Sequence, residues 1–158
     1  MVIILLVASP LLASTDSAAD KAFVEHARQA VGLLYAQDEQ GGMKMLCTTT
    51  AFEKVPTGYQ FVTAAHCIGK DNVEKERSAN PFKTSFFITF DEAKTEKKFY
   101  PSKPVFVGYQ SRGEDFAVFL VETKEPWQVV GLGDEKQIVD GAAYWNIASP
   151  LGLGRQTF

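Results

Sequence analysis

Two short segments of the sequence contain residue types that can move a proton. TAAHC ends at Cys67 and contains His66, one of two histidines in the chain, and EDFAVFLV places Asp115 directly before an apolar run. An imidazole that faces a cleft can act as a general base when a carboxylate accepts its Nδ1 hydrogen, because the carboxylate fixes the tautomer and stabilises the imidazolium. Either residue alone is more typical of a structural role, so the chemistry depends on a fold that brings His66 and Asp115 together.

The two cysteines of the chain, Cys47 and Cys67, are expected to serve the structure. A disulfide between them would close a short loop and stabilise the protein in an oxidising compartment. A zinc site is the alternative, but His66 and Cys67 are adjacent and cannot both point at one ion from an extended strand, and His26 lies far away in a different kind of segment. We therefore expect no metal ion and no cofactor.

The elements that must position these residues follow an N-terminal leader. Residues 2–12 are apolar and uncharged but too short to span a bilayer as a helix, and Ala13 and Ser14 offer a plausible cleavage region. We expect residues 1–14 to be a signal peptide, no stable membrane span, and a secreted or periplasmic protein. The leader has no Lys or Arg before its apolar run, which leaves a retained anchor or a wrongly assigned start codon as alternatives.

The composition excludes some partner classes. Hydrophobic residues make up 46% of the chain and charged residues 22%, which is typical of a globular protein with one sizeable core. The net charge is −3, and basic residues are scattered among acidic ones, as in KDNVEKER. No broad basic surface is expected, so a nucleic-acid partner is not supported. The oligomeric state cannot be inferred from these features.

The segment after the leader has helical spacing, and the pattern then changes to that of short strands. Asp16 is a possible N-cap of a short amphipathic helix within residues 15–30. Turn signals occur at Gly41 and Gly42 and again after Pro56. Strand-like segments cover 31–37, 43–52, 59–67, 84–90, 97–109 and 115–122. Regular spacing with no helix between these strands predicts a closed antiparallel barrel, so the fold class is all-β.

One predicted strand is irregular. Pro101 and Pro104 interrupt the segment 97–109. Proline cannot donate a backbone hydrogen bond, so this strand should be bent or lie at an edge. The charged segment 70–81 should be a loop.

Together these features resemble the trypsin-like serine proteases of the chymotrypsin fold. In that family a T-A-A-H-C segment carries the general base, and a D-x-A-V/L segment carries the acid that orients it. The resemblance implies that His66 is the base and Asp115 its orienting acid. Cys47 matches the first-barrel cysteine that pairs with the one after the catalytic His, which implies a Cys47–Cys67 disulfide.

The C-terminal segment narrows the resemblance. ASPLG, residues 148–152, is similar to a phrase at the start of the second barrel in proteases of the high-temperature-requirement type. The R-I-V-G-G activation site of digestive enzymes has no match, since the nearest segment is RQAVGLL. The resemblance covers residues 31–158 and implies a complete first barrel over 31–126 and a second barrel begun over 127–158.

The family's nucleophile lies in a G-D/N-S-G-G segment, and this sequence contains none. Ser149 is the only serine after Asp115, and its context has neither the glycines nor the turn of a nucleophile segment. We expect the nucleophile to lie beyond residue 158 and the chain as written to be inactive.

The function implied by the resemblance is that of a serine endopeptidase that acts on proteins or peptides, with unknown specificity. Two alternatives stay open. One is an inactive homologue that serves as a binding module, and the other is a cysteine nucleophile in the same fold, as in some viral relatives.

Overall fold

The computed structural model describes residues 18–68, 84–90, 96–109, 112–134, 136, 147–148 and 156–157. Its elements are helix α1 (Ala18–Gln29), strands β1 (Val31–Gln37), β2 (Met43–Val55) and β3 (Gly58–Thr63), the short 3-10 helix η1 (Ala65–Ile68), and strands β4 (Ser85–Thr89), β5 (Tyr100–Val107), β6 (Ala117–Glu122), β7 (Ile147–Ala148) and β8 (Gln156–Thr157). The leader, Asp16 and the segment 70–81 lie outside these residues.

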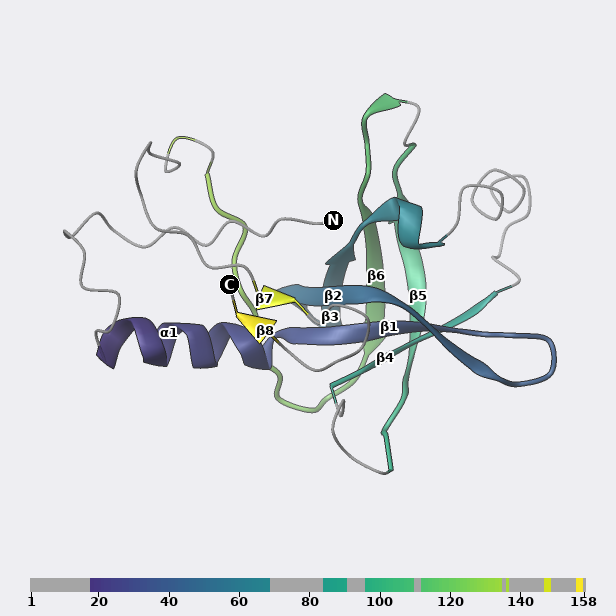
Figure 1. Cartoon of the computed structure of the whole chain (residues 1–158), viewed down its shortest axis with the longest axis horizontal. Helices are drawn as coiled ribbons and strands as arrows, with labels where there is room; N and C mark the ends of the chain where they lie inside the picture. The colour runs from purple at the N-terminus through teal and green to yellow at the C-terminus, as the bar shows by residue number, and fades with distance from the viewer. Residues whose placement is uncertain are drawn as a thin grey trace.

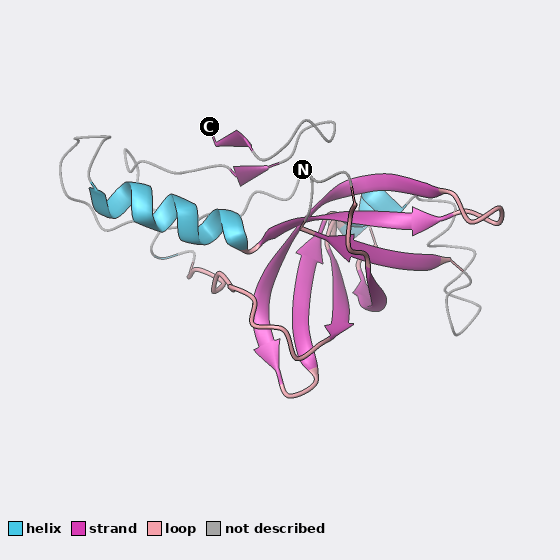
Figure 2. Ribbon diagram, turned by 90° about the horizontal axis from the view of Figure 1, so that it is seen from below, coloured by secondary structure: helices cyan, strands magenta, loops and turns pink. Residues whose placement is uncertain are grey.

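Six strands form one closed antiparallel barrel in the order β1-β2-β3-β6-β5-β4 (Figure 1). The predicted barrel and its all-β class are confirmed, and α1 lies to one side of the barrel (Figure 2). The chain closes the barrel by pairing β1 with both β2 and β4. In a closed barrel each strand has a neighbour on both sides, so the six strands form no open sheet edge.

The N-terminal half of the barrel follows local signals. β1 and β2 are joined by a turn in which Asp38 Oδ1 accepts backbone N–H groups of Gln40 at 3.0 Å and Gly42 at 2.6 Å. Gly41 has φ +85°, a left-handed conformation that glycine adopts without strain. The predicted turn is therefore confirmed, and β2 extends three residues further than expected, to Val55.

Helix α1 is anchored to the barrel at its C-terminal end. Ala27 and Ala30 are buried, and the carbonyl oxygen of Ala30 accepts the N–H of Ala51 in β2 at 2.9 Å. The predicted helix is present, starting at Ala18 in the described residues and ending at Gln29.

Strand β5 was expected to be bent or to lie at an edge of the sheet, and the structure shows only the irregularity. It lies between β4 and β6, so it is not an edge strand. Its pairing with β6 shifts register between Pro104 and Phe106, which is the irregularity that the prolines predict. Pro104 lies opposite Phe119 and Phe106 opposite Val118, so Val105, directly after Pro104, is the extra residue of the bulge.

The core lies inside the barrel and consists mainly of aromatic and aliphatic side chains. Phe61 on β3 and Phe119 on β6 are fully buried, and the Phe119 ring packs edge-on against Phe86 of β4 at 5.2 Å. Burial of each such side chain stabilises the fold by about 1.5–3 kcal/mol. The Trp127 ring packs against Phe61, with ring centroids 5.8 Å apart, and the backbone N–H of Trp127 donates to the Tyr59 hydroxyl at 3.0 Å. The connection after β6 is thereby fixed against the barrel.

The C-terminal part is described only in pieces. β7 and β8 form a two-stranded antiparallel sheet, in which Ile147 pairs with Thr157. The second barrel expected over 127–158 stays a prediction. Among the described residues, no helix has the length and apolar character needed to cross a membrane.

Candidate active site

The TAAHC segment turns sharply after β3. The strand ends at Thr63, and Ala65–Ile68 form a single 3-10 turn in which Cys67 N–H donates to the Ala64 carbonyl at 3.2 Å. The expectation that a strand continues to Cys67 is wrong. The physical reason is that Ala64 and Ala65 are small enough to pack into the barrel end, with 2% and 3% exposure, which lets the chain coil there. His66 is consequently exposed at the barrel end.

A hydrogen-bonded loop places Asp115 beside this turn. Gly108 N–H donates to the Phe116 carbonyl at 2.8 Å, and Glu114 N–H donates to the Tyr109 carbonyl at 3.1 Å. A Cβ atom at Gly108 would overlap the carbonyl oxygen of Glu114, so only glycine fits this close approach. The loop leads directly into β6.

The pairing of β3 with β6 brings the two segments together. Thr63, the last residue of β3, lies opposite Ala117, the first residue of β6. Residues just after Thr63 therefore meet residues just before Ala117, because antiparallel neighbours run in opposite directions. This register places His66 next to Asp115.

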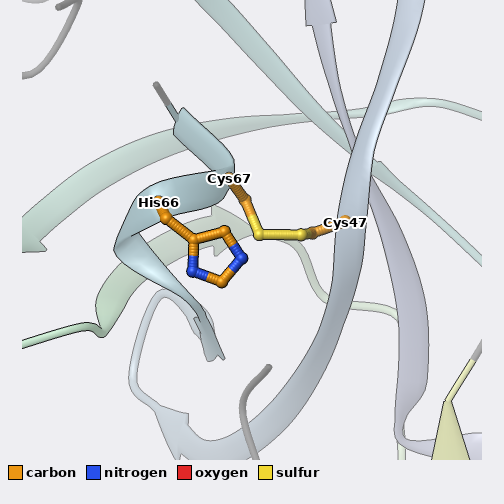
Figure 3. A group of neighbouring side chains, drawn as sticks. All are labelled: Cys47, His66 and Cys67. Atoms are coloured by element: carbon orange, nitrogen blue, oxygen red, sulfur yellow. A yellow bond between two sulfur atoms is a disulfide. The ribbon is translucent and has the colours of Figure 1, made fainter. Parts of the chain in front are cut away.

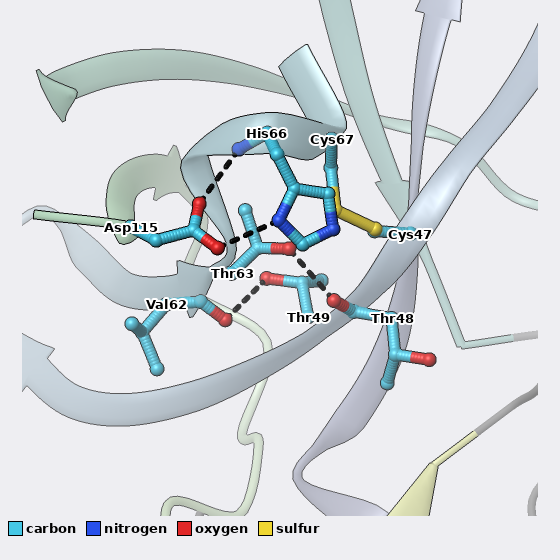
Figure 4. Close-up of a disulfide and its surroundings, with 8 residues drawn as sticks. All are labelled: Cys47, Thr48, Thr49, Val62, Thr63, His66, Cys67 and Asp115. Atoms are coloured by element: carbon cyan, nitrogen blue, oxygen red, sulfur yellow. Dashed lines mark hydrogen bonds and ion pairs between the residues drawn. A yellow bond between two sulfur atoms is a disulfide. The ribbon is translucent and has the colours of Figure 1, made fainter. Parts of the chain in front are cut away.

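Asp115 binds His66 at two points (Figure 4). One carboxylate oxygen, Oδ1, accepts the backbone N–H of His66 at 2.9 Å, and Oδ2 lies 2.7 Å from the ring Nδ1. An ionised carboxylate only accepts hydrogen bonds, so Nδ1 carries the hydrogen and Nε2 keeps a lone pair in the neutral ring. The arrangement can take up a proton at Nε2 and stabilise the resulting imidazolium.

The pair is more exposed than the sequence interpretation requires. The side chain of His66 is 43% exposed and that of Asp115 is 42% exposed, whereas a carboxylate that orients a general base is expected to be at least partly buried. The physical reason is that Asp115 precedes β6 and so lies at the rim of the barrel, outside its interior. Even when the imidazole is charged, an exposed pair of this kind adds at most about 1 kcal/mol to stability, so the main effect of Asp115 is to orient the ring.

Two buried threonines fix the strands beneath the pair. Thr63 Oγ1 donates to the Thr48 carbonyl at 2.8 Å, and Thr49 Oγ1 donates to the Val62 carbonyl at 3.1 Å. Figure 4 draws both side chains together with His66 and Asp115. Sequence reasoning missed both. The run of threonines after Cys47 was a weak signal for Thr49, because threonine is common in strands for packing reasons as well, and Thr63 had no such signal.

Cys47 and Cys67 form a disulfide, as predicted, with Cα atoms 5.9 Å apart. Cys47 lies on β2 and Cys67 on η1, so the bridge ties the turn that carries His66 to the barrel wall. The expected position of Cys67 on a strand is wrong. In the turn, the donor atoms of Cys47, His66 and Cys67 all lie within 4.8 Å of one another (Figure 3), so the argument from an extended strand against a shared metal ion does not hold.

Of the two remaining candidate residues, only His26 is among the described residues, and it does not join the site. His26 lies exposed on α1, and Ser149 lies outside the described residues. Among the described residues, the structure therefore brings together His66, Asp115 and the disulfide.

Comparisons with known proteins identify no family for this chain. No protein-family model matches the sequence, and no curated protein matches it significantly. The interpretation of the site therefore depends on its own residues and geometry.

Proposed function

We propose that this chain forms the first barrel of an exported serine endopeptidase of the chymotrypsin fold, nearest to the high-temperature-requirement type. The observation that carries the proposal is the double contact of Asp115 with the backbone and the ring of His66. A carboxylate that accepts both hydrogens holds the imidazole in one tautomer and one orientation, which is what a general base in acyl transfer needs.

In the proposed reaction, His66 Nε2 takes the proton from a serine hydroxyl as its oxygen attacks the carbonyl carbon of a peptide bond. His66 then donates that proton to the leaving amine, and an acyl-enzyme remains. A water molecule attacks the acyl-enzyme by the same route and releases the second product. Asp115 stays ionised throughout and stabilises the imidazolium in each half of the reaction.

Three further features support the proposal. The closed six-stranded barrel gives the pair a rigid frame, since His66 and Asp115 follow and precede paired strands. The Cys47–Cys67 disulfide is compatible with an oxidising compartment and hence with export. The order of the base and the acid along the chain agrees with the family resemblance, in which the nucleophile comes last.

The proposal requires a serine nucleophile from a segment after Phe158, and this requirement gives the sharpest test. The source transcript would be read beyond the codon for Phe158. We expect an open frame that encodes G-x-S-G-G within about 30 to 70 further codons, enough to complete a domain of about 200 residues. A stop codon directly after Phe158, or Gly or Ala in place of the serine, would overturn the protease and leave a binding module as the function.

The extended chain would then be expressed and assayed with a fluorophosphonate probe and with a denatured protein substrate. We expect serine labelling and proteolysis in the wild type. Asp115→Asn should lower kcat by about 10⁴-fold, because the amide favours the wrong imidazole tautomer. The matched control His26→Ala should retain full activity. Equal activity of Asp115→Asn and the wild type would show that the pair is not catalytic.

A further inference from the structure

The disulfide and His66 form a cluster with the composition of a metal site. Two sulfur atoms and one imidazole nitrogen lie within 4.8 Å of one another. In Figure 4, Nδ1 faces Asp115 while the other ring nitrogen, Nε2, lies on the side of the ring nearest the disulfide. In the oxidised protein the two sulfurs are bonded to each other, and a disulfide is a poor metal ligand because the thiolate is the binding form.

We propose that reduction of Cys47–Cys67 converts this cluster into a Zn²⁺ site formed by Cys47 Sγ, Cys67 Sγ and His66 Nε2. Tetrahedral zinc holds sulfur at about 2.3 Å and nitrogen at about 2.0 Å, so its ligand atoms lie roughly 3.4–3.8 Å apart. Once the S–S bond is broken, the sulfurs must separate to that distance, and the imidazole nitrogen must come to the same distance from each sulfur. Side-chain rotations supply both movements, since the Cα atoms of the cysteines are already 5.9 Å apart.

Asp115 provides a second, independent reason for a metal at Nε2. Histidines that bind zinc usually donate their other ring N–H to a carboxylate, which fixes the tautomer and raises the basicity of the ligand atom. Asp115 Oδ2 accepts from Nδ1 at 2.7 Å, and Oδ1 is held by the His66 backbone at 2.9 Å. The lone pair on Nε2 is therefore already oriented before any metal arrives.

The site is also accessible. His66 is exposed and both cysteines are half-buried, so an ion can reach the cluster from solvent. Two thiolates and one imidazole occupy three positions of a tetrahedral ion and leave the fourth for water, which is a known ligand arrangement for zinc.

The reaction balances with a dithiol as the reductant. Thiol–disulfide exchange transfers two electrons and two protons to the sulfurs, which become thiols, and the dithiol becomes a disulfide. Binding of Zn²⁺ then releases the two thiol protons to water, since zinc binds the thiolate form. Oxidation by a disulfide of the same class reverses the exchange and releases the ion.

Metal binding at Nε2 would occupy the lone pair that accepts the serine proton, so the reduced protein would be held inactive by zinc. This consequence alone rests on the proposed function. The binding of zinc does not depend on it and can be tested on the chain as it is.

The experiment titrates Co²⁺ and then competing Zn²⁺ into the oxidised chain and into the chain reduced with a dithiol and desalted without oxygen. We expect one metal ion per reduced chain, visible absorption bands of four-coordinate cobalt with thiolate ligands, and affinity at least about 100-fold weaker in the oxidised chain. His66→Ala should weaken binding by at least tenfold, and Asp115→Asn by about tenfold, relative to the matched control His26→Ala.

Far-UV circular dichroism on the same samples shows whether the barrel persists, and zinc should raise the unfolding temperature of the reduced chain. Equal affinity in His66→Ala and His26→Ala would overturn the site, because binding would then involve the thiols alone. Loss of the β-sheet circular dichroism signal on reduction, both without and with zinc, would also overturn the zinc site. Neither result bears on proteolysis by the oxidised protein.

Discussion

Asp115 accepts one hydrogen bond from the backbone of His66 and lies within hydrogen-bond distance of its ring, at 2.9 Å and 2.7 Å. The ring orientation of His66 is therefore set by two elements at once, the turn η1 that carries it and the loop before β6 that carries the carboxylate. This relationship makes the pair sensitive to changes in either element.

Asp115→Asn should change the tautomer of His66. The amide oxygen can still accept the backbone N–H, which turns the amide nitrogen toward Nδ1, and the ring must then carry its hydrogen on Nε2. Nitrogen chemical shifts of the ring, measured by NMR, should report this exchange, with a stability change of at most about 1 kcal/mol because the pair is exposed. Asp134→Asn, at an exposed aspartate, is the control. An unchanged tautomer in Asp115→Asn would contradict the hydrogen bond.

Removal of the disulfide should destabilise the barrel. Cys47 and Cys67 are 20 residues apart, and a loop of that size corresponds to a loss of about 3 kcal/mol when the bridge is removed. Urea unfolding of the Cys47→Ala/Cys67→Ala variant against the oxidised wild type measures this difference. Mass spectrometry before and after reduction checks that the wild type is bridged, and two free thiols in protein from an oxidising compartment would contradict the structure.

Gly108→Ala should disturb the loop that carries Asp115. The added Cβ overlaps the Glu114 carbonyl oxygen, so the backbone must move, at a cost of about 1–3 kcal/mol. The NMR signals of the His66 ring should shift in the same variant. Gly131→Ala is the matched control, since a Cβ there meets no atom within 4 Å. Equal stability and unchanged ring signals in both variants would show that the close approach at Gly108 has no structural role.

Two buried hydroxyl groups should respond in opposite ways. Ser102 Oγ is buried without a hydrogen-bond partner among the described residues, so Ser102→Ala should raise the free energy of unfolding by about 1 kcal/mol. Thr63 Oγ1 donates to the Thr48 carbonyl, so the isosteric Thr63→Val should lower it by about 1–2 kcal/mol. Chemical denaturation of the two variants side by side measures both effects. A loss of stability in Ser102→Ala would indicate that its hydroxyl has a partner after all.

The free energy of unfolding should fall at high pH because Lys98 and Tyr100 both donate hydrogen bonds to Glu125. Burial, followed by the hydrogen bond to Glu125, raises the pKa of Tyr100 above 10.0, and hydrogen bonds to Glu125 and Tyr100 raise the pKa of Lys98 above 10.5. A group whose pKa is higher in the folded state stabilises fully below its unfolded pKa, and this contribution is lost as the pH rises through the folded value.

Urea unfolding between about pH 9 and pH 11 tests this sign in the wild type and in Tyr100→Phe. The variant keeps the aromatic ring but has no phenol to titrate, so its stability should fall less steeply. Identical slopes for the two proteins would mean that Tyr100 does not contribute to the alkaline loss.

The barrel could be predicted from the sequence because its signals are local. Alternating apolar residues in β2 and a glycine turn at Gly41 each require only neighbouring residues to be recognised. The disulfide was also within reach, since the chain has only two cysteines. The local sequence pattern wrongly predicted that Cys67 lies on a strand. A short apolar segment such as the one after Thr63 is compatible with either a strand or a 3-10 turn.

Features that depend on contacts between distant segments could not be predicted in the same way. The exposure of Asp115 follows from its place at the barrel rim, and the hydrogen bonds of Thr49 and Thr63 follow from the register between β2 and β3. The central position of β5 follows from closure of the barrel, which no single strand encodes.

The sequence alone determined which residue types were available for chemistry, the order of His66 and Asp115, and the apolar patterns that predict the strands. The tertiary structure decided that Asp115 meets both the backbone and the ring of His66, and that the two cysteines converge beside the same ring. The reason is physical. Patterning and turn chemistry act over a few residues, whereas the distance between two side chains far apart in the chain is set only when the barrel closes and its strands take one register.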